Sequence, residues 1–228
     1  MSVDFIMADV TQLIGQKLDA MDADTNMTNL CKSYFDGSSS PTTSVVDMAR
    51  LEEKTFVLLN WAMGLFQLGV HRAYAVDTLL TTWTNLYNKA QAKLPKPKAI
   101  DFFTILYKWL DTSDAAHRTE NAFAIGITFG DLTRQGLFSY RRYLQVLVAE
   151  GHSARSRAPG KPRSHHLPLL AAMPIFVQAK DLLQQRRLAL CGDDEEAKAR
   201  LDQEEERLMD EFRQEVKEYI PELFGLSG

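Results

Sequence analysis

The chain has 228 residues, of which 45% are hydrophobic and 25% charged, the usual composition of a folded globular protein. Its formal net charge of −4 excludes a protein that coats nucleic acid through overall basicity. Two cysteines, Cys31 and Cys191, are too few for a disulfide framework and have no CxxC spacing, which suits a reducing compartment. The longest apolar stretch, residues 167–177, is too short to span a bilayer, so we expect no membrane segment.

Breaks rich in glycine, serine and proline divide the chain into four predicted parts. We expect an N-terminal helical segment over residues 1–36 and a flexible linker over residues 37–44. A helical array is predicted over residues 45–192, and an acidic amphipathic helix with a tail over residues 193–228. A further loop is expected over residues 151–162, which contain two prolines and two glycines.

Apolar residues within the array recur mostly at intervals of three and four, which predicts helices. Such stripes run through residues 56–66, 76–87, 100–110 and 137–148. Ser139 is a candidate N-cap of the last of these helices, and Gly151 stands where a left-handed C-terminal residue would fall. The stripes predict a structural core that includes Trp61, Leu79, Trp83, Phe138 and Leu144.

The stretch Phe123–Phe129 alternates large and small residues with the period of a strand. The chain offers no second strand of similar quality, and an isolated strand leaves its backbone groups unpaired. We therefore expect helix here and an all-α fold. Short connections favour antiparallel neighbours, so the predicted architecture is helical hairpins stacked in a HEAT-like array.

Charge is segregated along the second half of the chain. Residues 134–187 contain ten Lys or Arg and two acidic residues, whereas residues 193–218 contain twelve acidic and five basic residues. The acidic stretch keeps an apolar stripe through Leu208, Phe212 and Tyr219, so it is either a solvated outer helix or a helix that docks on a partner.

No catalytic constellation is apparent, so we expect no enzyme activity, no cofactor and no metal. The histidines match no HExxH pattern, and the glycines near residue 130 match neither GxGxxG nor a P-loop. The tandem pair His165 and His166 is suggestive, but consecutive residues of a regular helix diverge by about 100°. On that argument the pair does not share one ion.

Three ordered stretches carry a resemblance to a known family. The first is Leu58-Leu59-Asn60-Trp61-Ala62, with a Gly-Val-His-Arg-Ala-Tyr-Ala-Val run at residues 69–76. The second covers residues 129–151, and the third runs from Ser164-His165-His166-Leu167 to the Gln-Arg-Arg-Leu-Ala-Leu-Cys-Gly run at residues 185–192. Together they resemble the LCEWA region of subunit 12 of the Mediator complex over roughly residues 58–192. The signature's Cys and Glu are here Leu59 and Asn60, which favours packing over chemistry at those positions.

The resemblance implies a non-enzymatic scaffold that takes part in regulating RNA polymerase II transcription in the nucleus. Its implied partners are Mediator subunit 13, cyclin C and the cyclin-dependent kinase of the same module. The alternative is a helical module that binds nucleic acid through the basic tract of residues 134–187, where Arg141 and Arg142 stand between Tyr140 and Tyr143.

Candidate partner-binding residues are basic side chains near predicted helix ends: His71, Arg72, Arg141, Arg142, Arg186 and Arg187. Arg72 either binds carbonyl or carboxylate groups of the preceding hairpin or remains an exposed charge. Trp61 is expected to be a buried anchor of its helix rather than an interface residue.

Overall fold

The computed structural model describes residues 18–19, 21, 24–43, 45–63, 70–152, 164–174 and 180–220. Every regular element in these ranges is helical, which confirms the all-α class. The α-helices are α2 (Met27–Tyr34), α3 (Met48–Met63), α4 (Val70–Gln91), α5 (Phe102–Thr112), α6 (Asp114–His117), α7 (Ala122–Arg134), α8 (Tyr140–Ala149), α10 (His166–Ala172), α11 (Lys180–Cys191) and α12 (Glu195–Tyr219). Two short 3-10 helices complete the set: η1 (Gly37–Ser39) lies between α2 and α3, and η2 (Thr119–Asn121) lies between α6 and α7.

The chain forms two compact units. Unit 1 comprises residues 1–143 and 165–176, and unit 2 comprises residues 144–164 and 177–228. The predicted boundaries after residues 36, 44 and 192 stay predictions, and residues 1–17 of the expected N-terminal segment lie outside the described ranges. Most of the expected loop over residues 151–162 lies outside them as well.

The ambiguous stretch Phe123–Phe129 lies inside α7, which confirms the helical prediction. Ile125 and Phe129 are fully buried, whereas Phe123 is exposed. The alternation therefore reflects helix faces and not the two sides of a strand: residues four apart point the same way, and the intervening Ile127 is only partly buried.

Helix ends follow the local sequence. The hydroxyl of Ser139 accepts a hydrogen bond from the backbone N–H of Arg142 at 3.3 Å, as expected of an N-cap for α8. At the other end Gly151 has φ of 66°, the left-handed conformation that a residue with a Cβ adopts at a cost. Asp194 caps α12 by accepting from the N–H of Ala197 at 2.9 Å. Ser139 and Gly151 thus mark the two ends of α8 where the sequence predicted them, whereas the Asp194 cap was not predicted.

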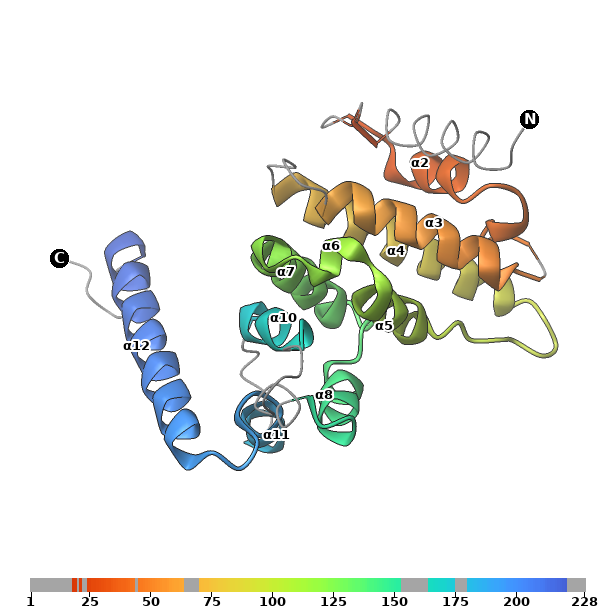
Figure 1. Cartoon of the computed structure of the whole chain (residues 1–228). Helices are drawn as coiled ribbons and strands as arrows, with labels where there is room; N and C mark the ends of the chain where they lie inside the picture. Colours follow the sequence, from red (N-terminus) through yellow and green to blue (C-terminus); the bar gives the residue numbers. More distant parts are fainter. Residues whose placement is uncertain are drawn as a thin grey trace. The chain divides into compact units, whose positions relative to one another are not determined.

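Unit 1 is built from helices that contact one another in a chain of neighbours. Helix α3 contacts α4 and α5, α4 also contacts α2 and α7, and α7 contacts α10 (Figure 1). Two fully buried tryptophans tie these helices together, and each indole N–H has an acceptor. Trp83 donates to the carbonyl of Ser39 at 3.0 Å, and Trp109 donates to the side-chain oxygen of Asn60 at 2.9 Å. The core is thus aromatic, and the indole N–H groups of both buried tryptophans are satisfied.

Helices α7 and α10 approach each other closely in unit 1. A Cβ built on Gly126 would lie 2.4 Å from the carbonyl oxygen of Ala172, nearer than any real contact allows. The glycine is therefore what lets the two backbones meet, and the small Ala172 serves the same purpose on α10.

Leu79, Trp83, Phe138 and Leu144 of the predicted core are all buried. Trp61 differs, since its side chain is only partly buried. Its indole N–H donates to the carboxylate of Asp19 at 2.9 Å, so the ring lies at the rim of unit 1 with its polar edge at the surface. Among the described helices, none combines the length and the apolar character needed to cross a bilayer.

Candidate functional site

Arg72, at the start of α4, binds groups of its own unit. Its guanidinium donates to the carbonyl oxygen of Trp61 at 2.9 Å and to the carboxylate of Asp19 at 3.0 Å. The same group lies 4.5 Å from the centroid of the Trp61 ring, a cation–π contact. Arg72 was expected either to bind carbonyl or carboxylate groups or to remain an exposed charge, and the structure shows it bound to both kinds of group. The carbonyl it satisfies is near the end of α3, where unpaired C=O groups attract cations.

Arg142, on α8, is held in the same manner. Both of its terminal nitrogens donate to the carboxylate of Asp101, at 2.9–3.1 Å, and its guanidinium lies 4.1 Å from the ring centroid of Phe103. These hydrogen bonds lower the pKa of the Asp101 carboxyl, with burial opposing them. The fork geometry is that of a structural clamp between the loop before α5 and the first turn of α8.

Arg186 and Arg187, on α11, face carboxylates of α12 in unit 2. The Nε of Arg186 lies 3.5 Å from Glu205, and the Nε of Arg187 lies 2.6 Å from Asp202. Arg186 is buried, whereas the Arg187 pair is partly exposed. Helix α12 has no buried residue of its own, and these two ion pairs join it to α11.

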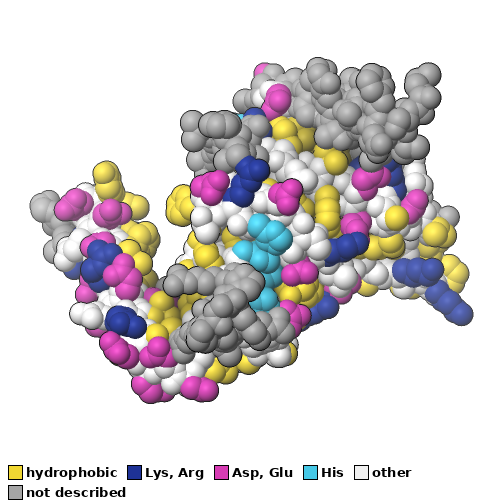
Figure 2. Space-filling view, in the orientation of Figure 1, with side chains coloured by type: hydrophobic (Ala, Val, Ile, Leu, Met, Phe, Trp, Pro, Cys, Tyr) yellow, Lys and Arg dark blue, Asp and Glu magenta, His cyan; other side chains and the backbone are white. Residues whose placement is uncertain are grey.

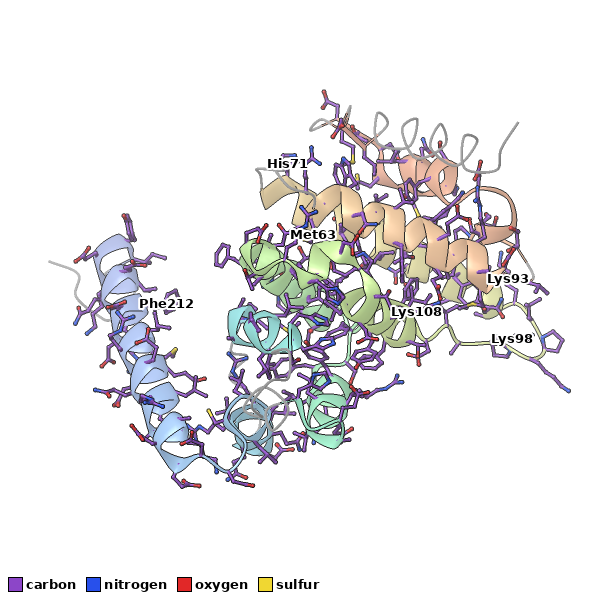
Figure 3. The ribbon with its side chains drawn as sticks, viewed as in Figure 1. Met63, His71, Lys93, Lys98, Lys108 and Phe212 are labelled. Atoms are coloured by element: carbon purple, nitrogen blue, oxygen red, sulfur yellow. The ribbon has the colours of Figure 1, made fainter. Side chains whose placement is uncertain are left out.

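The remaining two candidates, His71 and Arg141, are exposed on α4 and α8. Figure 3 shows His71 at the end of α4 that adjoins the end of α3. Four of the six predicted residues belong to unit 1, and Arg186 and Arg187 belong to unit 2. Carboxylates within the same unit bind Arg72, Arg142, Arg186 and Arg187.

The exposed apolar side chains of α12 form a surface of a different kind. Leu208, Met209, Phe212, Tyr219 and Ile220 are all substantially exposed, and Phe212 is 60% accessible. Phe212 projects away from the α12 backbone in Figure 3. The first two turns and the middle of the same helix carry rows of Glu and Asp, so the apolar stripe has acidic borders. Exposed apolar side chains along one helix make α12 a candidate docking face.

The sequence did not predict a basic stretch that begins in the last turn of α4 and continues into the loop after it. Lys89, Lys93, Lys96 and Lys98 are all exposed, and Figure 3 shows Lys93 and Lys98 where the chain leaves α4. Two prolines in the stretch Leu-Pro-Lys-Pro-Lys keep it out of a helix. The signal that would have found it is four lysines within ten residues around those prolines.

An open cavity of about 480 Å³ lies in unit 1 between α3, α6 and η2. Its lining includes Asn60, Ser113, Asp114 and Arg118. The side-chain oxygen of Asn60 accepts from both Trp109 and Ser113, at 2.9 and 3.1 Å, so it fixes the wall of the cavity. The lining residues contain no nucleophile with an adjacent histidine, as acyl-transfer chemistry needs.

A cluster of imidazoles in unit 1 lies beside Asp111. The rings of His165 and His166 have centroids 4.1 Å apart, and those of His117 and His165 are 3.9 Å apart. The rings of the tandem pair therefore do not diverge, contrary to the prediction for a regular helix. His165 is the N-cap residue of α10, and ring positions also depend on the side-chain torsions of residues whose Cα atoms are about 3.8 Å apart. Histidine side chains gather visibly on the face shown in Figure 2.

Comparison with known proteins gives one family. The chain is 29% identical over 187 aligned residues to the Mediator of RNA polymerase II transcription subunit 12 of Mycosarcoma maydis, covering 60% of this chain and 10% of that protein. The protein of the same name from Phaeosphaeria nodorum is 25% identical over 75% of this chain and 10% of its own length. That from Aspergillus fumigatus is 30% identical over 64% of this chain and 8% of its own.

The chain therefore resembles Mediator subunit 12, as the three sequence stretches indicated. It spans about a tenth of the length of the curated relatives it matches. No family model matches the chain, and no solved structure matches it.

Proposed function

We propose that this chain is a non-enzymatic helical module of a Mediator-type assembly, and that it takes part in regulating RNA polymerase II transcription in the nucleus through protein–protein contacts. The observation that carries the proposal is the similarity to four curated proteins, each named as subunit 12 of the Mediator, over 58–75% of the chain. The all-α fold is compatible with such a role, because stacked helices present extended surfaces to partner proteins.

The architecture we propose for unit 1 is a HEAT-like stack. Its support is the order of contacts, in which α3 packs on α4 and on α5, while α4 packs on α7 and α7 on α10. The clamps formed by Arg72 and Arg142 join segments far apart in sequence, and Lys108 of α5 pairs with Glu52 of α3 in the same manner. In this proposal the basic residues of unit 1 maintain the scaffold, and partners bind elsewhere.

The partner surface we propose is α12, the acidic C-terminal helix. Its exposed stripe around Leu208 and Phe212 suits an amphipathic helix of the partner, and the acidic borders require that helix to be basic. By the family resemblance the partner would be Mediator subunit 13, or the pair of cyclin C and its cyclin-dependent kinase.

Pull-down of purified subunit 13 and of the purified cyclin–kinase pair by the full chain tests this function. We expect one of them to bind, and we expect Leu208→Ser with Phe212→Ser to weaken binding at least about tenfold, since exposed anchors of this kind supply 1–2 kcal/mol or more. Phe123→Ser is the matched control, because Phe123 is also exposed, at 72% against 60% for Phe212, but lies on α7 in unit 1. Loss of binding in the control alone would place the surface on unit 1, and absence of binding by the wild-type chain would contradict the function.

Nucleic-acid binding through the basic tract of residues 134–187 has less support than the scaffold role. In the described part of the basic tract, four arginines pair with carboxylates, namely Arg134, Arg142, Arg186 and Arg187. The exposed lysines around the end of α4 lie outside that tract, and they are the observation that keeps nucleic-acid binding testable. A gel shift at two salt concentrations should show affinity falling steeply with salt if phosphates are bound. Binding that is lost in Lys93→Glu with Lys96→Glu would support the alternative over the scaffold.

A further inference from the structure

Four side chains from three segments of unit 1 converge at the start of α10. Asp111 comes from the last turn of α5, His117 from α6, and His165 and His166 from the N-terminus of α10. One ligand atom each of Asp111, His165 and His166 lies within 4.8 Å of the other two. His166 is buried, whereas Asp111 is exposed and His165 is intermediate, so the cluster is reachable from solvent. We propose that this cluster is a Zn²⁺ site that fastens α10 to α5.

The hydrogen bonds of the outer two histidines set their ring tautomers. The Nε2 of His165 lies 2.9 Å from the carbonyl oxygen of Leu110, and the Nε2 of His117 lies 3.0 Å from that of Asp111. A carbonyl oxygen only accepts, so in each neutral ring Nε2 carries the proton and the lone pair is on Nδ1. Metal-binding histidines are typically fixed in this way, with one nitrogen donating to a backbone carbonyl and the other turned to the metal.

The third histidine has the spacing of a ligand pair with Asp111. The Nε2 of His166 is 3.4 Å from the Asp111 carboxylate, which is long for a hydrogen bond. Two ligands of one tetrahedral Zn²⁺, with bonds of about 2.0–2.2 Å, stand about 3.4 Å apart. Tyr143 contacts the other nitrogen of His166 at 3.1 Å and, with Tyr107, gives the ring an aromatic surrounding. The donor set of imidazole and carboxylate selects Zn²⁺ over Mg²⁺ or Ca²⁺.

The ligand atoms of Asp111, His165 and His166 lie within 4.8 Å of one another, so small movements bring them to the spacing of ligands of one ion. His165 is only partly buried, which leaves its side chain room for such a movement while its Nε2 stays near the carbonyl of Leu110. His117 is exposed and packs edge-on against His165, where it is available as the fourth ligand in place of water. Bound Zn²⁺ would join α10, which contacts α7 through Gly126, to the end of α5.

Zn²⁺ titration of the full, EDTA-stripped chain tests the proposal. We expect one Zn²⁺ per chain by calorimetry, and a rise in Tm of about 5–10 °C at a concentration about 100-fold above Kd. Mg²⁺ at the same concentration should leave Tm unchanged. Co²⁺ in place of Zn²⁺ should give the visible absorption of a tetrahedral nitrogen and oxygen site.

The ligand variants are His165→Ala and Asp111→Asn, because removal of buried His166 risks unfolding the chain. Without metal, each should melt within about 2 °C of the wild type, as for surface substitutions. With metal, each should bind at least about 100-fold more weakly, so that the rise in Tm falls to about 1–2 °C. The control is His71→Ala, which removes an exposed histidine outside the cluster and should keep the full rise. The proposal is overturned if the wild-type chain shows no rise, or if the ligand variants keep it.

Discussion

At the scale of single residues, the arginines behave differently from what their place in the sequence indicates. Arg72 and Arg142 each combine a carboxylate acceptor with an aromatic ring under the guanidinium plane. Planar, delocalised arginine suits both contacts, and lysine would keep only the charge. An arginine near a helix end can therefore bind a group of its own unit as readily as a partner protein. Which of the two it binds depends on where its acceptor lies in the folded structure, and the sequence does not contain that position.

Asp77 of α4 gives a prediction at this scale. Its carboxylate is buried, one of its oxygens has no hydrogen-bond partner, and the Nε2 of Gln135 reaches the other only at 3.5 Å. Burial raises the pKa of Asp77, and nearby Asp131 raises it further. The folded state thus binds more protons than the unfolded state just above the ordinary pKa, so stability falls as pH rises through that window. We expect Asp77→Asn to raise Tm at pH 7, because the amide removes a buried charge.

The advantage of Asp77→Asn should shrink as the pH is lowered below the ordinary aspartate pKa, where the wild-type carboxyl is neutral in both states. Asp114→Asn is a suitable control, since Asp114 is exposed on the same unit. Thermal melts of both variants at pH 7 and at acid pH give the comparison. An equal or lower Tm for Asp77→Asn at pH 7 would contradict the account.

At the scale of elements, the contact of α7 with α10 depends on a single missing side chain. Gly126→Ala forces a methyl group against the backbone of Ala172, and backbone cannot yield as a flexible side chain does. We expect a loss of about 1–3 kcal/mol in the free energy of unfolding, despite the better helix propensity of alanine. Denaturant unfolding measures it. Phe123→Ala on the exposed face of α7 is the control and should be close to neutral; a stabilising Gly126→Ala would show that the helices do not approach as described.

The attachment of α12 to α11 gives a second prediction for elements. Reversing Arg186 and Arg187 to glutamate places like charges against Glu205 and Asp202. Breaking the buried Arg186 pair should cost about 3–5 kcal/mol of local stability, and the more exposed Arg187 pair about 0–1 kcal/mol. We expect faster amide hydrogen exchange in α12, with little change in helical circular dichroism.

Charge-swapped partners provide the check on that result. Adding Glu205→Arg and Asp202→Arg should restore slow exchange in α12, because the pairs are rebuilt with opposite sense. Arg200→Glu serves as control, since Arg200 is exposed and pairs along α12 with exposed Glu196. If the fourfold swap fails to restore protection, the ion pairs do not hold α12.

At the scale of the whole molecule, the sequence predicts the helices well and the contacts poorly. Stripes of apolar residues placed the helices of unit 1, and Ser139 and Gly151 marked the ends of α8. Local signals suffice there, because helix formation is decided within a few turns. Trp61 and the tandem histidines were misjudged because their surroundings come from Asp19 and from α5 and α6, up to 55 residues away in sequence. The spacing of apolar residues along the sequence does not show which distant segments will contact a residue in the fold.

Burial is uneven over the described residues, and this predicts uneven protection. Helices α4, α5 and α7 contain fully buried residues such as Trp83, Trp109 and Phe129, whereas α12 contains no buried residue. We expect amides of α12 to exchange at least about 100-fold faster than those of the three core helices. Hydrogen exchange read by mass spectrometry reports both at once. Protection in α12 equal to that in α7 would mean that its apolar stripe is already covered.

The ion pairs within α12 have a mechanical consequence. Arg207 bridges Glu204 and Glu211, and Arg213, Arg200 and Lys198 each pair with an acid three or four residues earlier. Such pairs stiffen a helix without help from a core. Twenty-five residues at 1.5 Å each make a rod of about 37 Å. Salt screens ion pairs between exposed side chains, so these pairs stabilise α12 less as the ionic strength rises. We therefore expect the length of α12 that stays helical to decrease with salt.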